Sequence, residues 1–244
     1  MPDASDLLNG NLGNILNFVA AAGALGTAAY GLVDASKAFG GGISNAGFGH
    51  IRQAIAPMVG YQGPSTPLTF GRRDVLATLR ANWLNGVAKA DQKATAKSLI
   101  RLGVTPENAR RLADETGVDV AKMIAIADKI RNGEKLLDTE ISVLGRFDAI
   151  VSAALDEAYE RADQVYRNTC KLVAALVATV LAVAGGAVIY VGNNSVSNGW
   201  AYPGTHQFWL AVLVGLISTP LAPVAKDLSS SLAAAVKAVG SVKR

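Results

Sequence analysis

The side chains that could carry acid–base or metal chemistry are few and scattered in this 244-residue chain. Its two histidines, His50 and His206, lie far apart in the sequence, and its single cysteine is Cys170. One helical stretch carries carboxylates at steps of three and four residues, a spacing that could hold a cation: Asp156, Glu157, Glu160 and Asp163. A di-iron site of this kind also needs a Glu-x-x-His on facing helices, and the histidine is missing. We therefore expect these carboxylates to form a solvated acidic helix face.

The sequence contains no motif of a common enzyme class. It lacks the Gly-x-x-x-x-Gly-Lys phosphate loop, the Gly-x-Ser-x-Gly nucleophile elbow and the His-Glu-x-x-His zinc motif. A single cysteine allows neither an intrachain disulfide nor a cysteine-based zinc site. We therefore expect a non-enzymatic protein, with no cofactor and with no catalytic, cofactor-binding or metal residues.

Basic residues are confined to two parts of the chain. All 23 lysines and arginines lie within 37–171 or 226–244, and residues 172–225 contain no Asp, Glu, Lys or Arg. Charged residues make up 17% of the chain, compared with about 25% in typical soluble domains. Because soluble proteins rarely separate charge from apolar sequence so completely, the composition predicts an integral membrane protein.

Three apolar segments are predicted to be transmembrane helices. The strongest covers 172–191, and its length matches the roughly 20 helical residues needed to cross a hydrocarbon core of about 30 Å. The first span, 12–36, is rich in small residues, and the third covers 206–225. Pro220 and Pro223 are expected to kink the third span, because each removes a backbone hydrogen-bond donor.

The distribution of Lys and Arg also predicts the orientation in the membrane. Under the positive-inside rule, segments rich in these residues lie in the cytoplasm. We therefore expect the cytoplasmic (inner) membrane of a prokaryote, with the N-terminus outside and the C-terminus inside. The remaining segments are assigned accordingly: 1–11 as a short extracytoplasmic tail, 192–205 as an extracytoplasmic loop and 226–244 as a cytoplasmic amphipathic tail.

The connector after the first span, 37–70, is rich in Gly and Pro. It contains an amphipathic segment, 43–59, and a predicted loop, 60–67. The apolar positions of 43–59 recur at helical spacing, but its polar face has few of the basic residues expected of an interfacial helix. Two interpretations therefore stay open: a helix on the membrane surface and a core helix of the protein.

Residues 71–137 are predicted to form a cytoplasmic helical domain, since their apolar residues recur at helical spacing between glycines. From 138 to 191 nothing interrupts this periodicity, so one long helix should continue into the second span. The predicted fold class is an all-α integral membrane protein with three transmembrane helices. Its cytoplasmic helical domain is inserted between the first and second of them.

Local signals mark the ends of the shorter helices. Gly86 is expected to divide the helical stretch that follows the connector. Thr105 followed by Pro106 predicts a helix N-terminus, because proline is tolerated at the first helical position. Gly117 and Gly133 are predicted to end the next two helices.

Charge within this region is polarised: bases outnumber acids over 72–111, and acids outnumber bases over 112–163. The predicted basic face, for a lipid or protein partner, consists of Arg72, Arg73, Arg80, Lys89, Lys93, Lys97 and Arg101. Two interpretations stay open. The oppositely charged faces complement each other within one subunit, or the basic face meets anionic lipid heads or the acidic helix of a neighbouring subunit.

Residues 112–133 resemble the helix-turn-helix unit of repressors in the spacing of a few residues: Leu112, Ala113, Gly117, Val118 and Ile124. The resemblance covers about twenty residues and has low specificity. The residues expected to face DNA are Asp119, Lys122, Ala125, Asp128 and Lys129. Two acids in this set oppose phosphate, which dominates DNA affinity, so we expect no nucleic acid as a partner.

Small residues in the first span predict close helix packing, because helices in lipid are held together by close approach of their backbones. The residues expected to make this contact are Gly23, Gly26, Thr27 and Gly31. Their partner is either another helix of the same chain or the same helix of a neighbour. The leading functional hypothesis is a structural or assembly subunit of a homo-oligomer or larger membrane complex, with membrane lipids as further partners.

An oligomeric channel or pore is the alternative. The spans contain no ionisable residue in their interior, which argues against a proton-coupled transporter. An uncharged polar lining would be supplied by Asn14, Asn17, Ser218 and Thr219. A membrane-tethered helix-turn-helix regulator is a distant third hypothesis.

Overall fold

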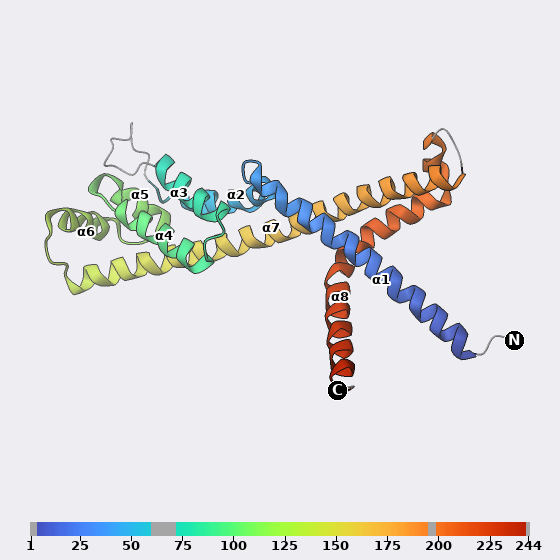
Figure 1. Cartoon of the computed structure of the whole chain (residues 1–244). Helices are drawn as coiled ribbons and strands as arrows, with labels where there is room; N and C mark the ends of the chain where they lie inside the picture. Colours follow the sequence, from blue (N-terminus) through green and yellow to red (C-terminus); the bar gives the residue numbers. More distant parts are fainter. Residues whose placement is uncertain (1–3, 60–71, 195–198, 243–244) are drawn as a thin grey trace. The chain divides into compact units, whose positions relative to one another are not determined.

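The computed structural model describes residues 4–59, 72–194 and 199–242, and every element in these ranges is helical (Figure 1). The α-helices are α1 (Ala4–Ala35), α2 (Asn45–Ile55), α3 (Arg72–Leu84), α4 (Lys89–Leu102), α5 (Pro106–Thr116), α6 (Val120–Asn132), α7 (Asp138–Asn194) and α8 (His206–Val242). Short 3₁₀ helices are η1 (Ser36–Ala38), η2 (Gly42–Ser44) and η3 (Gly199–Gly204). The prediction of an all-α chain is confirmed for this part of the sequence. The predicted loop at 60–67 lies outside the described residues.

Three helical segments are long and apolar enough to cross a membrane: Asn14–Ala38, Asp138–Asn193 and His206–Asp227. The 57-residue helix α7 is unbroken, as predicted from its uninterrupted periodicity. Both terminal helices extend beyond the predicted spans 12–36 and 206–225. The first helix already begins at Ala4, and α8 continues to Val242.

The chain divides into two compact units. The first, here called the span unit, comprises residues 1–39 and 168–244, and it contains α1, the second half of α7 and α8. The other, here called the inserted unit, comprises residues 40–167.

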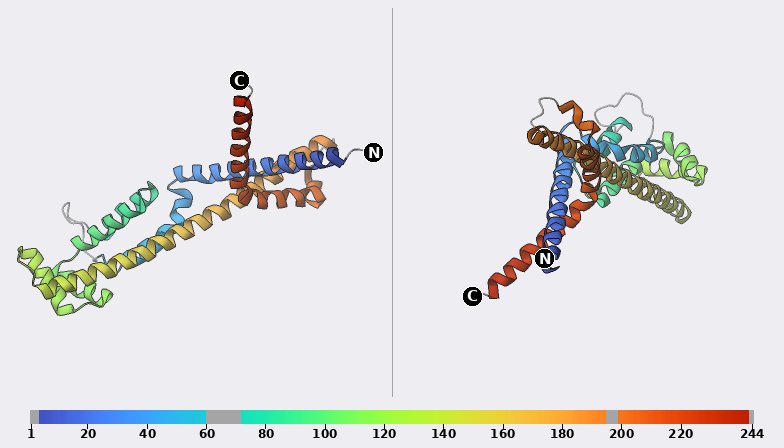
Figure 2. Two further views of the ribbon diagram at one scale, coloured as in Figure 1. Left: turned by 90° about the horizontal axis from the view of Figure 1, so that it is seen from below. Right: turned by 90° about the vertical axis from the view of Figure 1, so that its right-hand side faces the viewer.

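Within the span unit, α8 bends sharply, and α1 crosses it close to the bend (Figures 1 and 2). Pro220 and Pro223 lie inside α8. Each lacks the backbone N–H that would hydrogen-bond the preceding turn, which accounts for a bend in this part of the helix.

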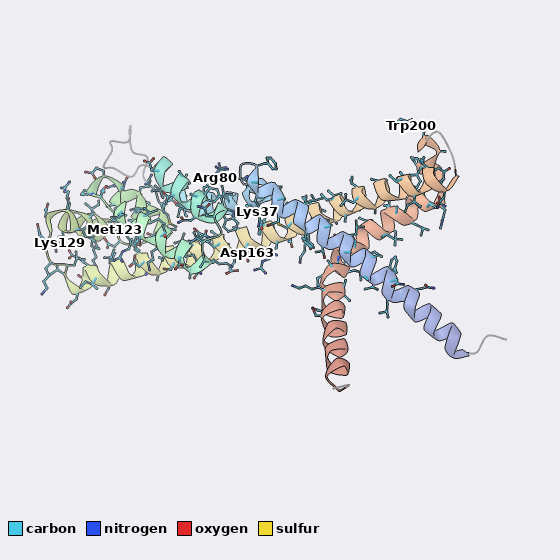
Figure 3. The ribbon with its side chains drawn as sticks, in the orientation of Figure 1. Lys37, Arg80, Met123, Lys129, Asp163 and Trp200 are labelled. Carbon is cyan, nitrogen blue, oxygen red and sulfur yellow. The ribbon has the colours of Figure 1, made fainter. Side chains whose placement is uncertain are left out.

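Aromatic rings join the end of α7, the short helix η3 and the start of α8. The ring centroids of Tyr190 and Tyr202 are 5.5 Å apart, those of Tyr202 and Phe208 5.6 Å, and those of Phe208 and Trp209 5.3 Å. Trp200, also in η3, is 87% exposed (Figure 3). Such a cluster at the end of two apolar helices suits the interface between membrane and water.

In the described part of the inserted unit, the first half of α7 supplies a continuous apolar stripe to a hydrophobic core. Phe147, Val151, Leu155 and Tyr159 recur every fourth residue and are almost completely buried. This spacing keeps them on one helix face. Helices α2 to α6 contribute the other buried residues of the core.

The structure distinguishes between the two interpretations of segment 43–59. Its helix, α2, has an apolar face that is buried in the core of the inserted unit, and the segment's buried apolar side chains are Phe48, Ile51, Ile55, Met58 and Val59. An apolar face that is already covered by protein cannot also lie in lipid, so this segment is a core helix.

The short helices begin and end close to the predicted residues. Gly117 and Gly133 adopt left-handed backbone angles directly after α5 and α6, with φ of 64° and 70°. Glycine is favoured there because it has no Cβ to clash in this conformation. The side chain of Asp119 caps α6 by accepting a hydrogen bond of 2.8 Å from the backbone N–H of Lys122.

The N-terminus of α7 is held by a buried carboxylate. One oxygen of Glu140 accepts a 2.7 Å hydrogen bond from the Leu137 N–H, and the other accepts a 2.8 Å hydrogen bond from Lys129 Nζ. A glutamate at this position satisfies a backbone donor that has no partner within the helix. The Leu137 hydrogen bond, followed by that from Lys129, lowers the pKa of Glu140.

We expect Glu140→Gln to destabilise the protein at neutral pH and to have less effect in acid. A carboxyl group whose pKa is lower in the folded chain stabilises the fold above its unfolded pKa, about 4.3. This contribution is lost as the pH falls through the folded value. The thermal midpoints of the wild type and the variant should therefore converge as the pH falls from neutral through the lowered pKa of Glu140. Glu115→Gln removes an exposed carboxylate as a control, and an equal gap for both variants would contradict this role.

Candidate functional site

The basic residues of α4 form a ladder of contacts with α7. Lys89 Nζ lies 3.0 Å from a carboxylate oxygen of Glu160, and Lys93 Nζ lies 2.6 Å from one of Asp156. The next two contacts are Lys97 Nζ to Ser152 Oγ at 3.0 Å and Arg101 Nε to Asp148 Oδ1 at 3.5 Å. The residues advance by four along α4 while their partners recede by four along α7, as expected for antiparallel helices.

Four members of the predicted basic face therefore have partners in the same chain. At one end of the ladder, Lys89 also reaches Asp163, which in turn binds Arg167. The hydrogen bond to Glu160 is the main cause that raises the pKa of Lys89. Partial burial raises the pKa of Asp163, but Arg167 and Lys89 outweigh it, and the net shift is downward. Within the described subunit, the structure agrees with the interpretation that the two faces complement each other.

Exchanging the charges of the Lys93–Asp156 pair should show that the ladder stabilises the inserted unit. Lys93→Glu places like charges opposite each other and should lower the free energy of unfolding by about 0.5–1 kcal/mol, since the pair is partly exposed. Adding Asp156→Lys should recover most of the loss, as measured by denaturant unfolding at low salt. Lys122→Glu on α6 is the charge-matched control. Failure of the double variant to recover would exclude a direct pairing.

The carboxylates considered as a cation site have basic neighbours. Asp156, Glu160 and Asp163 belong to the ladder, and Glu157 pairs with Arg161 at 2.8 Å. In the described ranges, no group of three or more His, Cys, Asp or Glu residues is placed to hold a metal ion.

Two of the small residues predicted for helix packing contact α8 of the same chain. A Cβ added at Gly23 would overlap Ala225, and one added at Gly26 would overlap the carbonyl oxygen of Ser218. The Thr27 hydroxyl donates a 2.9 Å hydrogen bond to the Gly23 carbonyl on its own helix. By contrast, a Cβ at Gly31 would have no neighbour within 4 Å. Within one chain, therefore, Gly23 and Gly26 contact α8 and Gly31 does not.

A second close contact was missed by the sequence argument. A Cβ at Gly215 of α8 would overlap the Cα of Thr179 in α7, so these helices touch backbone to backbone. Gly186 of α7 similarly accommodates the hydroxyl of Tyr202. The sequence indicated such contacts only through the presence of glycines within the apolar spans. A glycine alone does not show which helix packs against it.

The four candidate pore-lining residues lie on different surfaces. Asn14 and Asn17 are exposed on α1, whereas Ser218 and Thr219 are buried on α8. The Ser218 hydroxyl donates a 2.7 Å hydrogen bond to the Gly215 carbonyl. Within one chain these residues do not line a common path.

Three of the residues expected to face DNA are engaged within the inserted unit. Asp119 caps α6, Asp128 pairs with Arg131 at 3.0 Å, and Lys129 pairs with Glu140. The apolar side of α6, including Met123 and Ile126, is buried in the core, as expected of a packing helix.

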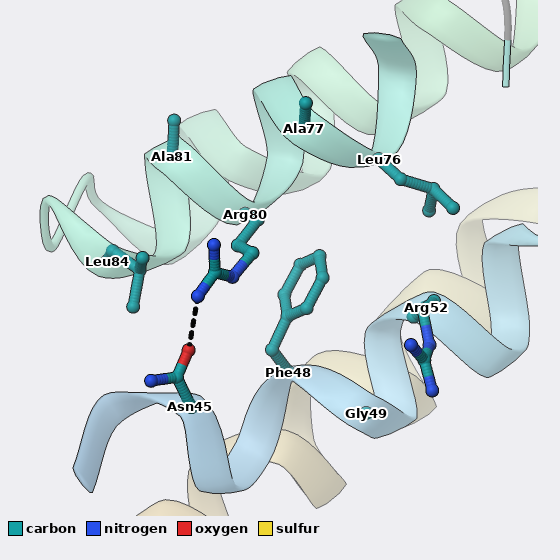
Figure 4. A pocket seen from close by; sticks show the side chains of 9 residues that line it. All are labelled: Asn45, Phe48, Gly49, Arg52, Leu76, Ala77, Arg80, Ala81 and Leu84. Atoms are coloured by element: carbon teal, nitrogen blue, oxygen red, sulfur yellow. Dashed lines mark hydrogen bonds between the residues drawn. The ribbon is translucent and has the colours of Figure 1, made fainter. Parts of the chain in front are cut away.

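A groove between α2 and α3 is lined by both apolar and basic residues (Figure 4). It has a volume of about 590 Å³. Arg80 of α3 donates a 2.8 Å hydrogen bond to the side-chain oxygen of Asn45 on α2, and the Phe48 ring stands between the two helices. Arg52 also lines the groove, although the sequence argument did not include it in the basic face.

These features define an all-helical protein with three helices that are long and apolar enough to cross a membrane. No protein-family model, curated protein or solved structure matched this chain.

Proposed function

We propose that this chain is a non-enzymatic structural subunit of a homo-oligomeric membrane assembly. The observation that carries the proposal is an uncovered apolar face on the span half of α7. Exposed side chains recur there every fourth residue: Leu172, Leu176, Val180, Ala184 and Val188. Only 11% of the most apolar part of this helix is buried within the chain, compared with 22% for each of the other two spans.

The shape of this face favours a second copy of the chain as its occupant. Gly185 lies beside the exposed row, and a Cβ there would have no neighbour within 4 Å. Rows spaced by four residues pack into the grooves of a like helix, and glycine lets the two backbones approach closely. Gly23 and Gly26 already pack against α8 of the same chain, so we assign the assembly contact to this α7 face.

The size of the full-length protein in mild detergent tests the proposal. We expect a discrete oligomer, which Gly185→Leu should shift to smaller particles because the side chain blocks close approach. Gly145→Leu is the matched control, since this glycine is exposed on the other half of α7, outside the apolar face, with no atom within 4 Å of its Cβ position. A monodisperse monomer for the wild type would overturn the proposal. Conductance of the wild type in planar bilayers would instead favour the pore.

We further propose the inner membrane of a prokaryote as the location, with the N-terminus outside and residues 37–171 in the cytoplasm. The support is the restriction of bases to this segment and to 226–244. Protease added to sealed right-side-out vesicles should therefore spare residues 37–171. Cleavage within residues 37–171 would indicate the opposite orientation in the membrane.

A further inference from the structure

The groove between α2 and α3 lies next to a second hollow on α2, with which it shares three lining residues. The second hollow has a volume of about 680 Å³, and both are lined by Gly49, Arg52 and Leu76. Each volume lies in the range of about 300–1,000 Å³ that is usual for small-ligand sites. Arg52 lies where the two hollows meet, because it lines both.

The charged side chains that line the groove and the second hollow are all basic. Arg52 and Arg80 line the groove, and neither hollow is lined by an Asp or Glu. Arg80 is held in place by Asn45, yet a guanidinium has five N–H donors and retains several for a ligand. In the described part of the chain, Arg52 has no ion pair. Residues 60–71, which follow α2, contain no acid that could supply one.

Beside the two arginines the groove is apolar. Phe48 stands between Arg80 and Leu76, and Leu84 closes the end near Asn45 (Figure 4). Ala77 and Ala81 line the same groove and leave it open, because their side chains are small. A ligand that fits must therefore combine an anionic group with a hydrocarbon part.

We propose that this groove binds one anionic phospholipid. Its phosphate meets the guanidinium of Arg80, since guanidinium matches phosphate oxygens well. Arg52, seven residues beyond Asn45 on α2, adds positive charge at the other end of the groove. The start of an acyl chain lies along Leu76 and Leu84, the partly exposed leucines of the groove. Three helices of this protein are apolar enough to cross a membrane, so lipid is available to the chain. The site does not depend on assembly, because all of its residues belong to one inserted unit.

Other occupants fit the surface less well. Residues 60–71 of the same chain are uncharged and leave the arginines without a counter-ion. Free phosphate leaves the apolar part empty. The groove also differs from the α4–α7 ladder, in which Lys89 and Lys93 already have acidic partners.

Native mass spectrometry of the full-length protein in neutral detergent tests the proposal. The probes are phosphatidylglycerol, phosphatidylcholine and inorganic phosphate. We expect phosphatidylglycerol to bind at least tenfold more tightly than phosphatidylcholine, and Arg52→Gln with Arg80→Gln to abolish this preference. The charge-matched control is Arg110→Gln with Lys135→Gln, two exposed bases outside the groove, and it should keep the preference.

A second variant separates the apolar part from the charge. Ala77→Trp fills the groove from an exposed position and should weaken phosphatidylglycerol binding while the fold is retained. The proposal is overturned if both double variants lose the preference equally. It is also overturned if phosphate displaces the lipid at equal concentration, or if the wild type shows no preference, as expected when residues 60–71 fill the groove.

Discussion

Gly47→Ala should destabilise the inserted unit by about 2 kcal/mol, although alanine normally strengthens a helix by about 1 kcal/mol relative to glycine. A Cβ at Gly47 would overlap the carbonyl oxygen of Ala162 in α7 and lie 2.9 Å from Trp83 Cζ2. A backbone carbonyl in the middle of a helix cannot move aside without breaking the local packing. The thermal unfolding of the helices, followed by circular dichroism in detergent, should therefore shift to lower temperature.

The same helix supplies the control. Gly49 is two residues further along α2, and a Cβ there would have no neighbour within 4 Å. Gly49→Ala should therefore stabilise the unit by up to about 1 kcal/mol through helix propensity alone. The prediction is thus a difference in sign between two identical substitutions. A shift of the same sign and size for both would show that α2 does not pack on α7 as described.

Gly26→Leu should destabilise the span unit by about 3 kcal/mol, because large side chains forced into a close contact displace the backbone. A Cβ at this position would overlap the Ser218 carbonyl oxygen and lie 2.7 Å from its carbon. The variant should separate α1 from α8. The fraction of protein that survives heating in detergent, measured by size-exclusion chromatography, should fall at temperatures that the wild type withstands.

Gly31→Leu is the control on the same helix, since no atom lies within 4 Å of its Cβ position. It should leave the thermal survival of the span unit unchanged. If Gly26→Leu instead produced smaller particles of unchanged thermal stability, the glycine would contact a neighbouring subunit and not α8 of its own chain.

Features that depend on neighbours along the sequence could be predicted well. The all-α class and the unbroken helix α7 follow from apolar periodicity, which is a local property. Pro106 and Gly117 indicate the two ends of α5. Proline is tolerated in the first turn of a helix but not in its interior, and glycine readily adopts the left-handed conformation that ends a helix. The absence of lysine and arginine from residues 1–36 and 172–225 likewise identified the three apolar segments.

Pairing between distant residues could not be predicted in this way. The sequence showed that Lys89, Lys93 and Arg101 share a helix face, and that acids dominate a later segment. It did not show that each base meets an acid of the same chain, because this requires α4 and α7 to be antiparallel and in register. Arg52 was missed for the same reason, since a single base on α2 gains significance only beside Arg80 of α3.

The sequence by itself determined where the chain is helical and which helices are apolar enough to enter a membrane, because both depend on residues close together in the chain. Only the tertiary structure decided what each face meets. An apolar face such as that of α2 is equally satisfied by lipid or by protein, and here the core of the inserted unit covers it. Gly23 and Gly26 could approach any helix, and they pack against α8 because Ser218, Ala222 and Ala225 offer the complementary small surface.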